Sequence, residues 1–260
     1  VALENLEDVA GSLEQSQWEY VKKYADRLNL RPTEWDTKFD NSLKQVFDYR
    51  FGQRPVANLS RTLRQVTFRG MLGGNISSAL RNLSQGVNTY SKLGEKYTAT
   101  GYMKLVTKGT KELREQGILR DNFIQDRVLS VTKKTMQRID KGLFAFFDMA
   151  EKINRGAAYF GAKSKALAQG LDETQAIEFA KKIVRDTQFL YSNVDIPLMM
   201  QGDLMKVMTQ FMSYPVKQTE FLAEMAKNKE IAGLLRYAVG GLAFVYSAGK
   251  LMNMEPKEFI

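Results

Sequence analysis

Residues 170–187 read GLDETQAIEFAKKIVRDT and carry several signals of an α-helix. Asp172 and Gln175 stand three residues apart just before an apolar run, which is the pattern of a capping box at the start of a helix. Gly170 is suited to ending the preceding helix, because glycine readily adopts a left-handed conformation. Apolar side chains then recur every three or four positions, as on one face of an α-helix. This predicted face consists of Ile177, Ala180, Ile183, Val184 and Thr187.

The same helical period extends outward in both directions. Thr33, with Asp36 three residues later, resembles another helix start, and residues 75–90 carry a further apolar stripe. Only 5 prolines occur among 260 residues, and no segment alternates apolar and polar residues as a strand does. The sequence therefore predicts an all-α protein, an elongated multi-helix assembly with short loops and no substantial sheet.

Two regions carry more specific expectations. Residues 94–117 are polar, basic and spaced by glycines, which is typical either of shorter helices or of a flexible exposed connection. The segment Thr187–Leu222 predicts a helix, a turn at Pro197, and a second helix whose Phe211 and Tyr214 pack inward.

Charge and hydropathy divide the chain into four segments. We expect an N-terminal helical segment at 1–52, a basic helical region at 53–140, a helical core module at 141–230 and an apolar segment at 231–260. The formal net charge is +9, and it is concentrated in residues 51–140, which alone carry +10. A basic block of this kind favours phosphate-rich partners, although a solvated basic helix face is equally common.

The composition removes several classes of chemistry. The chain has no cysteine and no histidine, so it lacks disulfides, thiol nucleophiles, imidazole bases and the usual transition-metal ligands. No nucleophile, base and orienting group stand at useful spacing. The sequence therefore predicts no catalytic residue, no metal site and no cofactor.

The basic region predicts a nucleic-acid contact that is directed at phosphates and insensitive to base sequence. We find no helix-turn-helix or other sequence-reading motif in it. The candidate residues are Arg61, Arg64, Arg69, Arg81, Lys104, Lys108, Lys133 and Lys134.

The most apolar segment is Ile231–Met252, in which Tyr237–Gly249 is an uncharged run of 13 residues. This run is short for a membrane span of about 20 residues, so a buried hairpin or core helix is one interpretation. The other is an interfacial or oligomer-assisted membrane segment, with glycines in helix contacts and Arg236 and Lys250 near headgroups. The candidate contact residues are Tyr237, Gly240, Gly241, Phe244 and Tyr246.

Three stretches resemble the large internal virion or DNA-ejection proteins of tailed bacteriophages. These are the large polyvalent proteins, a group that includes regions of giant virion-packaged RNA polymerases. The first stretch is GGNISSALRNLSQ at Gly73–Gln85, the second is EKINRGAAYFGAKSKALAQG at 151–170, and the third is TQFLYSNVDIPLMMQGDLMKVMTQFMSYPVKQTEFL at Thr187–Leu222. No catalytic residues come with this resemblance.

The resemblance implies a structural segment of an internal virion protein that assembles in the capsid or near the portal and takes part in genome ejection. Implied partners are other copies of itself, portal or ejection proteins, viral DNA through phosphate contacts, and the host membrane after release. The implied location is the capsid interior and then the host cell envelope. Two alternatives stay open: a sequence-independent nucleic-acid-binding helical domain, and a membrane-active helical protein.

Overall fold

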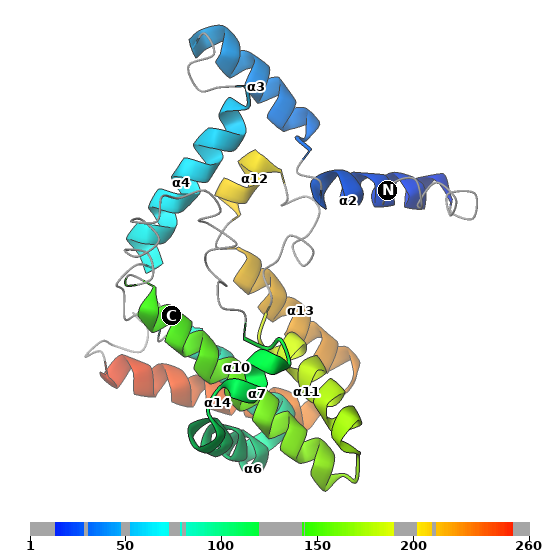
Figure 1. Cartoon of the computed structure of the whole chain (residues 1–260), viewed down its shortest axis with the longest axis vertical. Helices are drawn as coiled ribbons and strands as arrows, with labels where there is room; N and C mark the ends of the chain where they lie inside the picture. Colours follow the sequence, from blue (N-terminus) through cyan, green and yellow to red (C-terminus); the bar gives the residue numbers. More distant parts are fainter. Residues whose placement is uncertain are drawn as a thin grey trace. The chain divides into compact units, whose positions relative to one another are not determined.

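The structure, a computed structural model, describes residues 14–28, 31–47, 53–72, 79, 82–119, 142, 144–189, 202–209 and 212–251. Within these residues it contains ten α-helices and no strand, which confirms the all-α class (Figure 1). The helices are α2 (Gln15–Leu28), α3 (Glu34–Phe47), α4 (Pro55–Leu72), α6 (Gln85–Lys108), α7 (Lys111–Glu115), α10 (Ala145–Ala168), α11 (Glu173–Thr187), α12 (Asp203–Met208), α13 (Ser213–Lys227) and α14 (Ile231–Leu251).

The chain divides into two compact units, and each is interrupted in sequence by the other. Unit 1 consists of Val1–Val66 and Tyr191–Ser213, and unit 2 consists of Thr67–Leu190 and Tyr214–Ile260. This division follows packing, whereas the four segments expected from the sequence follow charge and hydropathy. Those four segments therefore remain a prediction.

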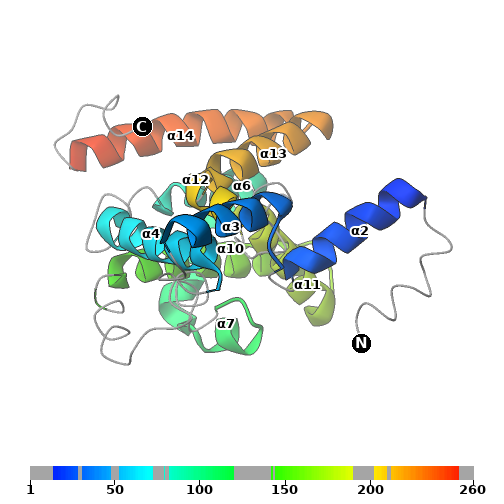
Figure 2. The same cartoon turned by 90° about the horizontal axis from the view of Figure 1, so that it is seen from above.

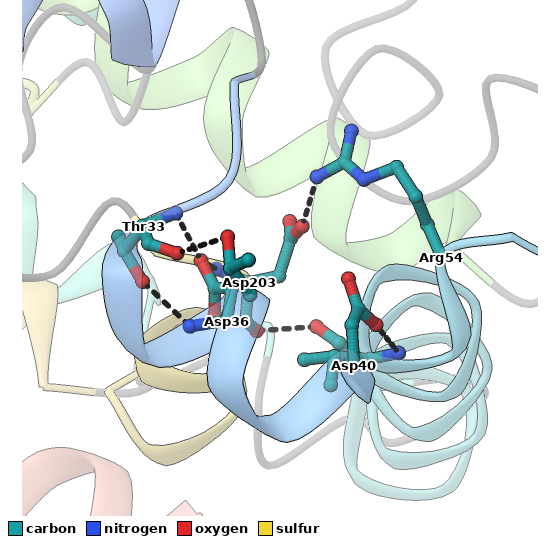
Figure 3. Close-up of polar contacts among 8 residues, drawn as sticks. Thr33, Asp36, Asp40, Arg54 and Asp203 are labelled. Carbon is teal, nitrogen blue, oxygen red and sulfur yellow. Dashed lines mark hydrogen bonds and ion pairs between the residues drawn. The ribbon is translucent and has the colours of Figure 1, made fainter. Parts of the chain in front are cut away.

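In unit 1, α3 begins with a reciprocal cap formed by Thr33 and Asp36, as their spacing predicts. The Thr33 hydroxyl oxygen accepts a hydrogen bond from the Asp36 amide at 2.9 Å, and the Asp36 carboxylate accepts one from the Thr33 amide at 2.9 Å (Figure 3). The same carboxylate accepts a bond from the amide of Asp203, the first residue of α12, at 3.1 Å. One buried side chain therefore serves the N-termini of two helices.

Two further aspartates join helix ends in unit 1. The Asp203 carboxylate accepts a hydrogen bond from Arg54 at 2.8 Å, and its backbone carbonyl accepts one from the Ser60 hydroxyl at 2.5 Å (Figure 3). Asp40 accepts a bond from the amide of Val56, in the first turn of α4, at 2.7 Å. Both carboxylates therefore accept hydrogen bonds that hold helix ends together. Among the described residues, no group of three His, Cys, Asp or Glu side chains is placed to hold a metal ion.

The core of unit 2 forms around α10, which packs against α6 and α11 (Figure 1). Tyr159 and Phe160 are buried at its centre, and their rings meet edge to face with 5.4 Å between centroids. Leu113 of α7 and Val184 of α11 are buried in the same cluster. Burial of such apolar side chains is the main stabilising contribution to a fold of this kind.

Two glycines let α6 and α10 approach until their backbones touch. A Cβ atom on Gly101 would collide with the carbonyl oxygen of Ala157. A Cβ atom on Gly161 would lie 2.5 Å from the carbonyl oxygen of Tyr97. The crossing of these helices therefore requires glycine at both positions, because backbone atoms cannot move aside as a side chain can.

The helix predicted from residues 170–187 is confirmed as α11. Gly170 ends α10 with a φ of 85°, and the Asp172 carboxylate accepts a hydrogen bond from the Gln175 amide at 2.8 Å. The Gln175 side chain completes the capping box by accepting a bond from the Asp172 amide at 3.2 Å. Of the predicted face, Ile177 is only partly buried; the fully buried members are Ala180, Ile183, Val184 and Thr187.

α6 bends sharply at Gly94, whose φ of 74° and ψ of 179° lie outside the helical range. The Tyr102 hydroxyl oxygen lies 2.8 Å from the position of a Cβ on Gly86. A straight helix would separate these two residues by about 24 Å along its axis, so α6 folds back as two arms. For residues 94–117, the structure thus confirms shorter helices and not an exposed connection.

Cationic side chains supply donors to the carbonyl groups just before this bend. The Ser91 carbonyl accepts a hydrogen bond from Arg236 of α14 at 3.4 Å, and the Lys92 carbonyl accepts one from Lys165 of α10 at 3.1 Å. Carbonyls at an interrupted helical turn need partners of this kind. Burial, together with the nearby Arg236 charge, lowers the pKa of Lys165.

A buried layer of amide side chains, which we call the polar seam, crosses unit 2. Its members are Asn82, Gln85, Asn88, Asn154, Gln188 and Gln218. Asn88 and Gln218 exchange two hydrogen bonds, at 3.1 and 3.0 Å. Asn154 donates to the Asn82 carbonyl at 2.8 Å, and Gln188 donates to the Gln85 carbonyl at 3.1 Å. Each of the three stretches that carry the phage resemblance contributes at least one residue to this seam, so these residues lie together in unit 2.

Glu112 of α7 is tied to α10 by two hydrogen bonds. The Tyr159 hydroxyl donates to its carboxylate at 3.0 Å, and the Lys163 ammonium donates to it at 2.5 Å. Burial alone would raise the pKa of Glu112, but the bonds from Lys163 and Tyr159 lower it below the ordinary value of 4.5. The charged carboxylate is therefore favoured by folding.

Replacing Glu112 with glutamine is expected to lower the free energy of unfolding by about 1 to 2 kcal/mol at pH 7. Because the folded-state pKa is depressed, the wild-type advantage exists above pH 4.5 and disappears as the pH falls through the folded-state value. Urea unfolding of both proteins at pH 7 and at roughly pH 3 measures this. Glu178→Gln, which removes an exposed i, i+3 pair with Lys181, is the control and should change little at either pH.

Candidate functional site on the C-terminal helix

α14 is a single uninterrupted helix of 21 residues (Figure 2). By length and composition it could cross a membrane, and it is the one such helix among the described residues. Only 11% of its most apolar window is buried in the protein. The helix therefore differs from an ordinary core helix, whose apolar residues are covered on most sides.

One face of α14 docks on α6 through glycines. A Cβ atom on Gly240 would lie 3.0 Å from the ring of Tyr90 and 3.4 Å from Val87. A Cβ atom on Gly233 would lie 3.4 Å from the Ser91 carbonyl oxygen of α6, and 3.3 Å from the Met225 sulfur of α13. Of the glycines predicted to allow close helix association, Gly240 thus contacts another helix of the same chain, whereas Gly241 does not.

Polar contacts fix the N-terminal half of α14 to α6. The Arg236 guanidinium donates to the Ser91 carbonyl at the α6 bend. Glu230, which precedes the helix, pairs with Lys92 at 2.8 Å, and that ammonium also lies over the Phe221 ring at 5.5 Å. Arg236 is therefore engaged inside unit 2, and its position near lipid headgroups in the membrane alternative stays a prediction.

The opposite face of α14 is an exposed apolar stripe. Its members are Ile231, Leu235, Val239, Leu242 and Tyr246, and between 61% and 74% of each is exposed. Their separations of four, four, three and four residues place all five on one side of a helix. Soluble monomers rarely expose apolar side chains as a continuous row, and such surfaces mark contacts with a membrane or a protein.

The residues predicted to contact a membrane or another copy fall on different sides of α14. Tyr246 belongs to the exposed stripe, whereas Gly240 belongs to the docked face. A Cβ atom on Gly241 would meet nothing within 4 Å, and Tyr237 and Phe244 are half-buried. Four stripe residues, Ile231 to Leu242, were not predicted individually. They could have been found from their helical spacing, which places them on the side of the helix opposite Gly233 and Gly240.

The predicted nucleic-acid residues lie in both units. Arg61 is exposed and Arg64 is half-buried on the unit 1 part of α4, and burial lowers the pKa of Arg64. Lys108 is exposed near the end of α6 in unit 2, and Lys104 donates a hydrogen bond to Ser164 at 2.8 Å. The structure does not bring these four residues together on one unit. The Arg69 side chain and the residues Arg81, Lys133 and Lys134 lie outside what the structure describes.

Part of the prediction for Thr187–Leu222 can be compared with the structure. Tyr214 packs against Phe189, with 5.9 Å between ring centroids, and its hydroxyl lies 3.3 Å from that of Ser84. The inward packing of Tyr214 is thus confirmed. Pro197 and Phe211 lie outside the described residues.

No protein-family model, curated protein or solved structure matches this chain. Two features of the chain itself bear on its role: the polar seam, to which all three resembling stretches contribute, and the apolar stripe of α14.

Proposed function

We propose that this chain is a structural segment of a tailed-bacteriophage internal virion protein, which is stored in the capsid and takes part in delivering the genome across the host envelope. In this role it binds other virion proteins and copies of itself, contacts viral DNA through phosphates, and reaches the host membrane after release. It performs no catalysis and needs no cofactor.

The meeting of the three resembling stretches in the polar seam is the observation that carries this proposal. Asn82 and Gln85 come from the first stretch, Asn154 from the second, and Gln188 and Gln218 from the third. Residues that share one buried hydrogen-bonded layer specify a particular helix arrangement. The proposal is supported because residues from all three resembling stretches take part in one buried layer of unit 2.

The α14 stripe supports the delivery part of the proposal. A protein that leaves the capsid and enters an envelope needs a surface compatible with apolar surroundings, and the stripe is the clearest such surface among the described residues.

The proposal is tested by the composition of phage particles that encode this chain. Mass spectrometry of purified particles should find its peptides in full capsids and find them depleted in capsids that have ejected their DNA. Capsids that never contain the peptides would refute the virion role. Peptides retained unchanged after ejection would refute the delivery role and leave a fixed capsid component.

The DNA contact makes a separate prediction about salt. If Arg61 and the other basic residues contact phosphates, the affinity for duplex DNA should fall steeply with salt and be equal for unrelated sequences. Triple charge reversal of Arg61, Arg64 and Arg69 to glutamate should lower the affinity for every sequence alike. Fluorescence anisotropy between about 50 and 200 mM salt measures both. A flat salt dependence would contradict phosphate contacts.

A further inference from the structure

We infer that α14 binds the surface of an anionic lipid bilayer while it remains docked on α6, lying in the plane of the membrane with its apolar stripe among the acyl chains. This inference rests on the proposed contact with the envelope. It adds the lipid charge, the binding face and the orientation, and it differs from a transmembrane arrangement of the same helix.

The charges around the stripe favour anionic lipid. α14 contains two charged residues, Arg236 and Lys250, and no acidic one. Lys227, the last residue of α13, and Lys229, in the turn between α13 and α14, are both exposed. The one carboxylate in that turn, on Glu230, is already paired within unit 2. Lysines therefore border the stripe at both ends, where they can reach phosphate headgroups.

The same charges disfavour a second copy of the chain on the stripe. If two stripes met in parallel, Lys250 would lie near Lys250 of the other copy. If they met in antiparallel fashion, Lys250 would approach the other copy's Lys227 and Lys229. Like charges at the edge of a contact oppose association, and neither orientation supplies an acidic partner from α14.

The contacts of the docked face favour an in-plane orientation. A spanning helix would have to leave α6, which would remove the donor to the Ser91 carbonyl at the bend and the close packing of Gly233 and Gly240. Unpaired backbone groups and charges are strongly disfavoured in a bilayer core. The stripe can enter the interface with none of these contacts broken, as amphipathic helices do.

The absence of cysteine in the sequence makes a site-specific test possible in the whole chain. We suggest three variants labelled with the environment-sensitive fluorophore NBD: Val239→Cys and Leu242→Cys on the stripe, and Ser247→Cys as the control. Ser247 is also exposed, but it is turned from the centre of the stripe by roughly 120°. Each labelled protein is mixed with vesicles of phosphatidylglycerol and phosphatidylcholine, and with vesicles of phosphatidylcholine alone.

The inference expects labels at 239 and 242 to shift to the blue with the anionic vesicles and to be quenched by lipid-bound quenchers. The label at 247 should stay accessible to aqueous iodide. Equal protection of all three labels would overturn the in-plane orientation in favour of insertion. No shift at any position would overturn lipid binding, and a dimer in sedimentation would then assign the stripe to a second copy.

Substitutions test the same surface without labels. Val239→Gln with Leu242→Gln should weaken binding to anionic vesicles on the order of a hundredfold, or tenfold per side chain. Met103→Gln with Val106→Gln on α6 is the matched control, because those residues are also apolar and are 69% and 84% exposed, but do not belong to the stripe. An equal loss in both double variants would overturn the assignment to the stripe. Neither result bears on the proposed function, which is tested separately by the protein composition of phage particles.

Discussion

Replacing Gly101 with alanine is expected to lower the free energy of unfolding by at least about 3 kcal/mol. The added Cβ would overlap the carbonyl oxygen of Ala157 and approach the amide nitrogen of Gly161. Both are backbone atoms of α10, so α6 and α10 would have to move apart and lose contacts along their whole crossing. Thermal or urea unfolding followed by circular dichroism measures the loss.

Gly241→Ala provides the matched control for this substitution. Gly241 also lies within a helix, but a Cβ there would meet nothing within 4 Å. Alanine restricts the unfolded chain more than glycine does, so this variant should be as stable as the wild type or more stable by up to about 1 kcal/mol. Equal destabilisation by both substitutions would contradict the close α6–α10 crossing.

Replacing Arg155 with leucine is expected to lower the free energy of unfolding by about 3 to 5 kcal/mol. Arg155 and Glu151 pair at 2.9 Å on the same side of α10, and their side chains are only 6% and 7% exposed. The substitution leaves the Glu151 carboxylate buried without this partner. Desolvation of an uncompensated charge accounts for the large effect.

The double variant Glu151→Leu with Arg155→Leu separates charge from packing. It removes both charges together, and exchange of a buried ion pair for apolar side chains is often nearly neutral. We therefore expect the double variant to be markedly more stable than Arg155→Leu alone. A double variant that is as unstable as the single one would indicate that Arg155 acts through packing or through other contacts.

Local signals in the sequence predicted several elements correctly. The caps at Thr33 and Asp172 depend on residues within one helical turn, so spacing alone identifies them. The bend at Gly94 could not be placed in this way, because its stabilising donors come from Lys165 and Arg236, far along the chain. Residue spacing gives no information on which helices will supply such partners.

The candidate surface was predicted only in part for a similar reason. The sequence identified the apolar segment and its glycines, but it left open whether the segment is buried. Burial of the segment depends on which face of α14 packs against α6. The close fit of Gly240 against Tyr90 and Val87 determines that face. Once that face is fixed, the helical period determines that Val239 and Leu242 point away from α6.

The alternation of the two units along the chain has a practical consequence for making fragments. The polypeptide passes from one unit to the other three times, so no single cut yields two complete halves. A fragment that ends before Asp203 lacks the residue that bonds to Asp36, Arg54 and Ser60. To isolate unit 2, residues 67–190 would have to be joined to residues 214–260 by a short linker that replaces 191–213.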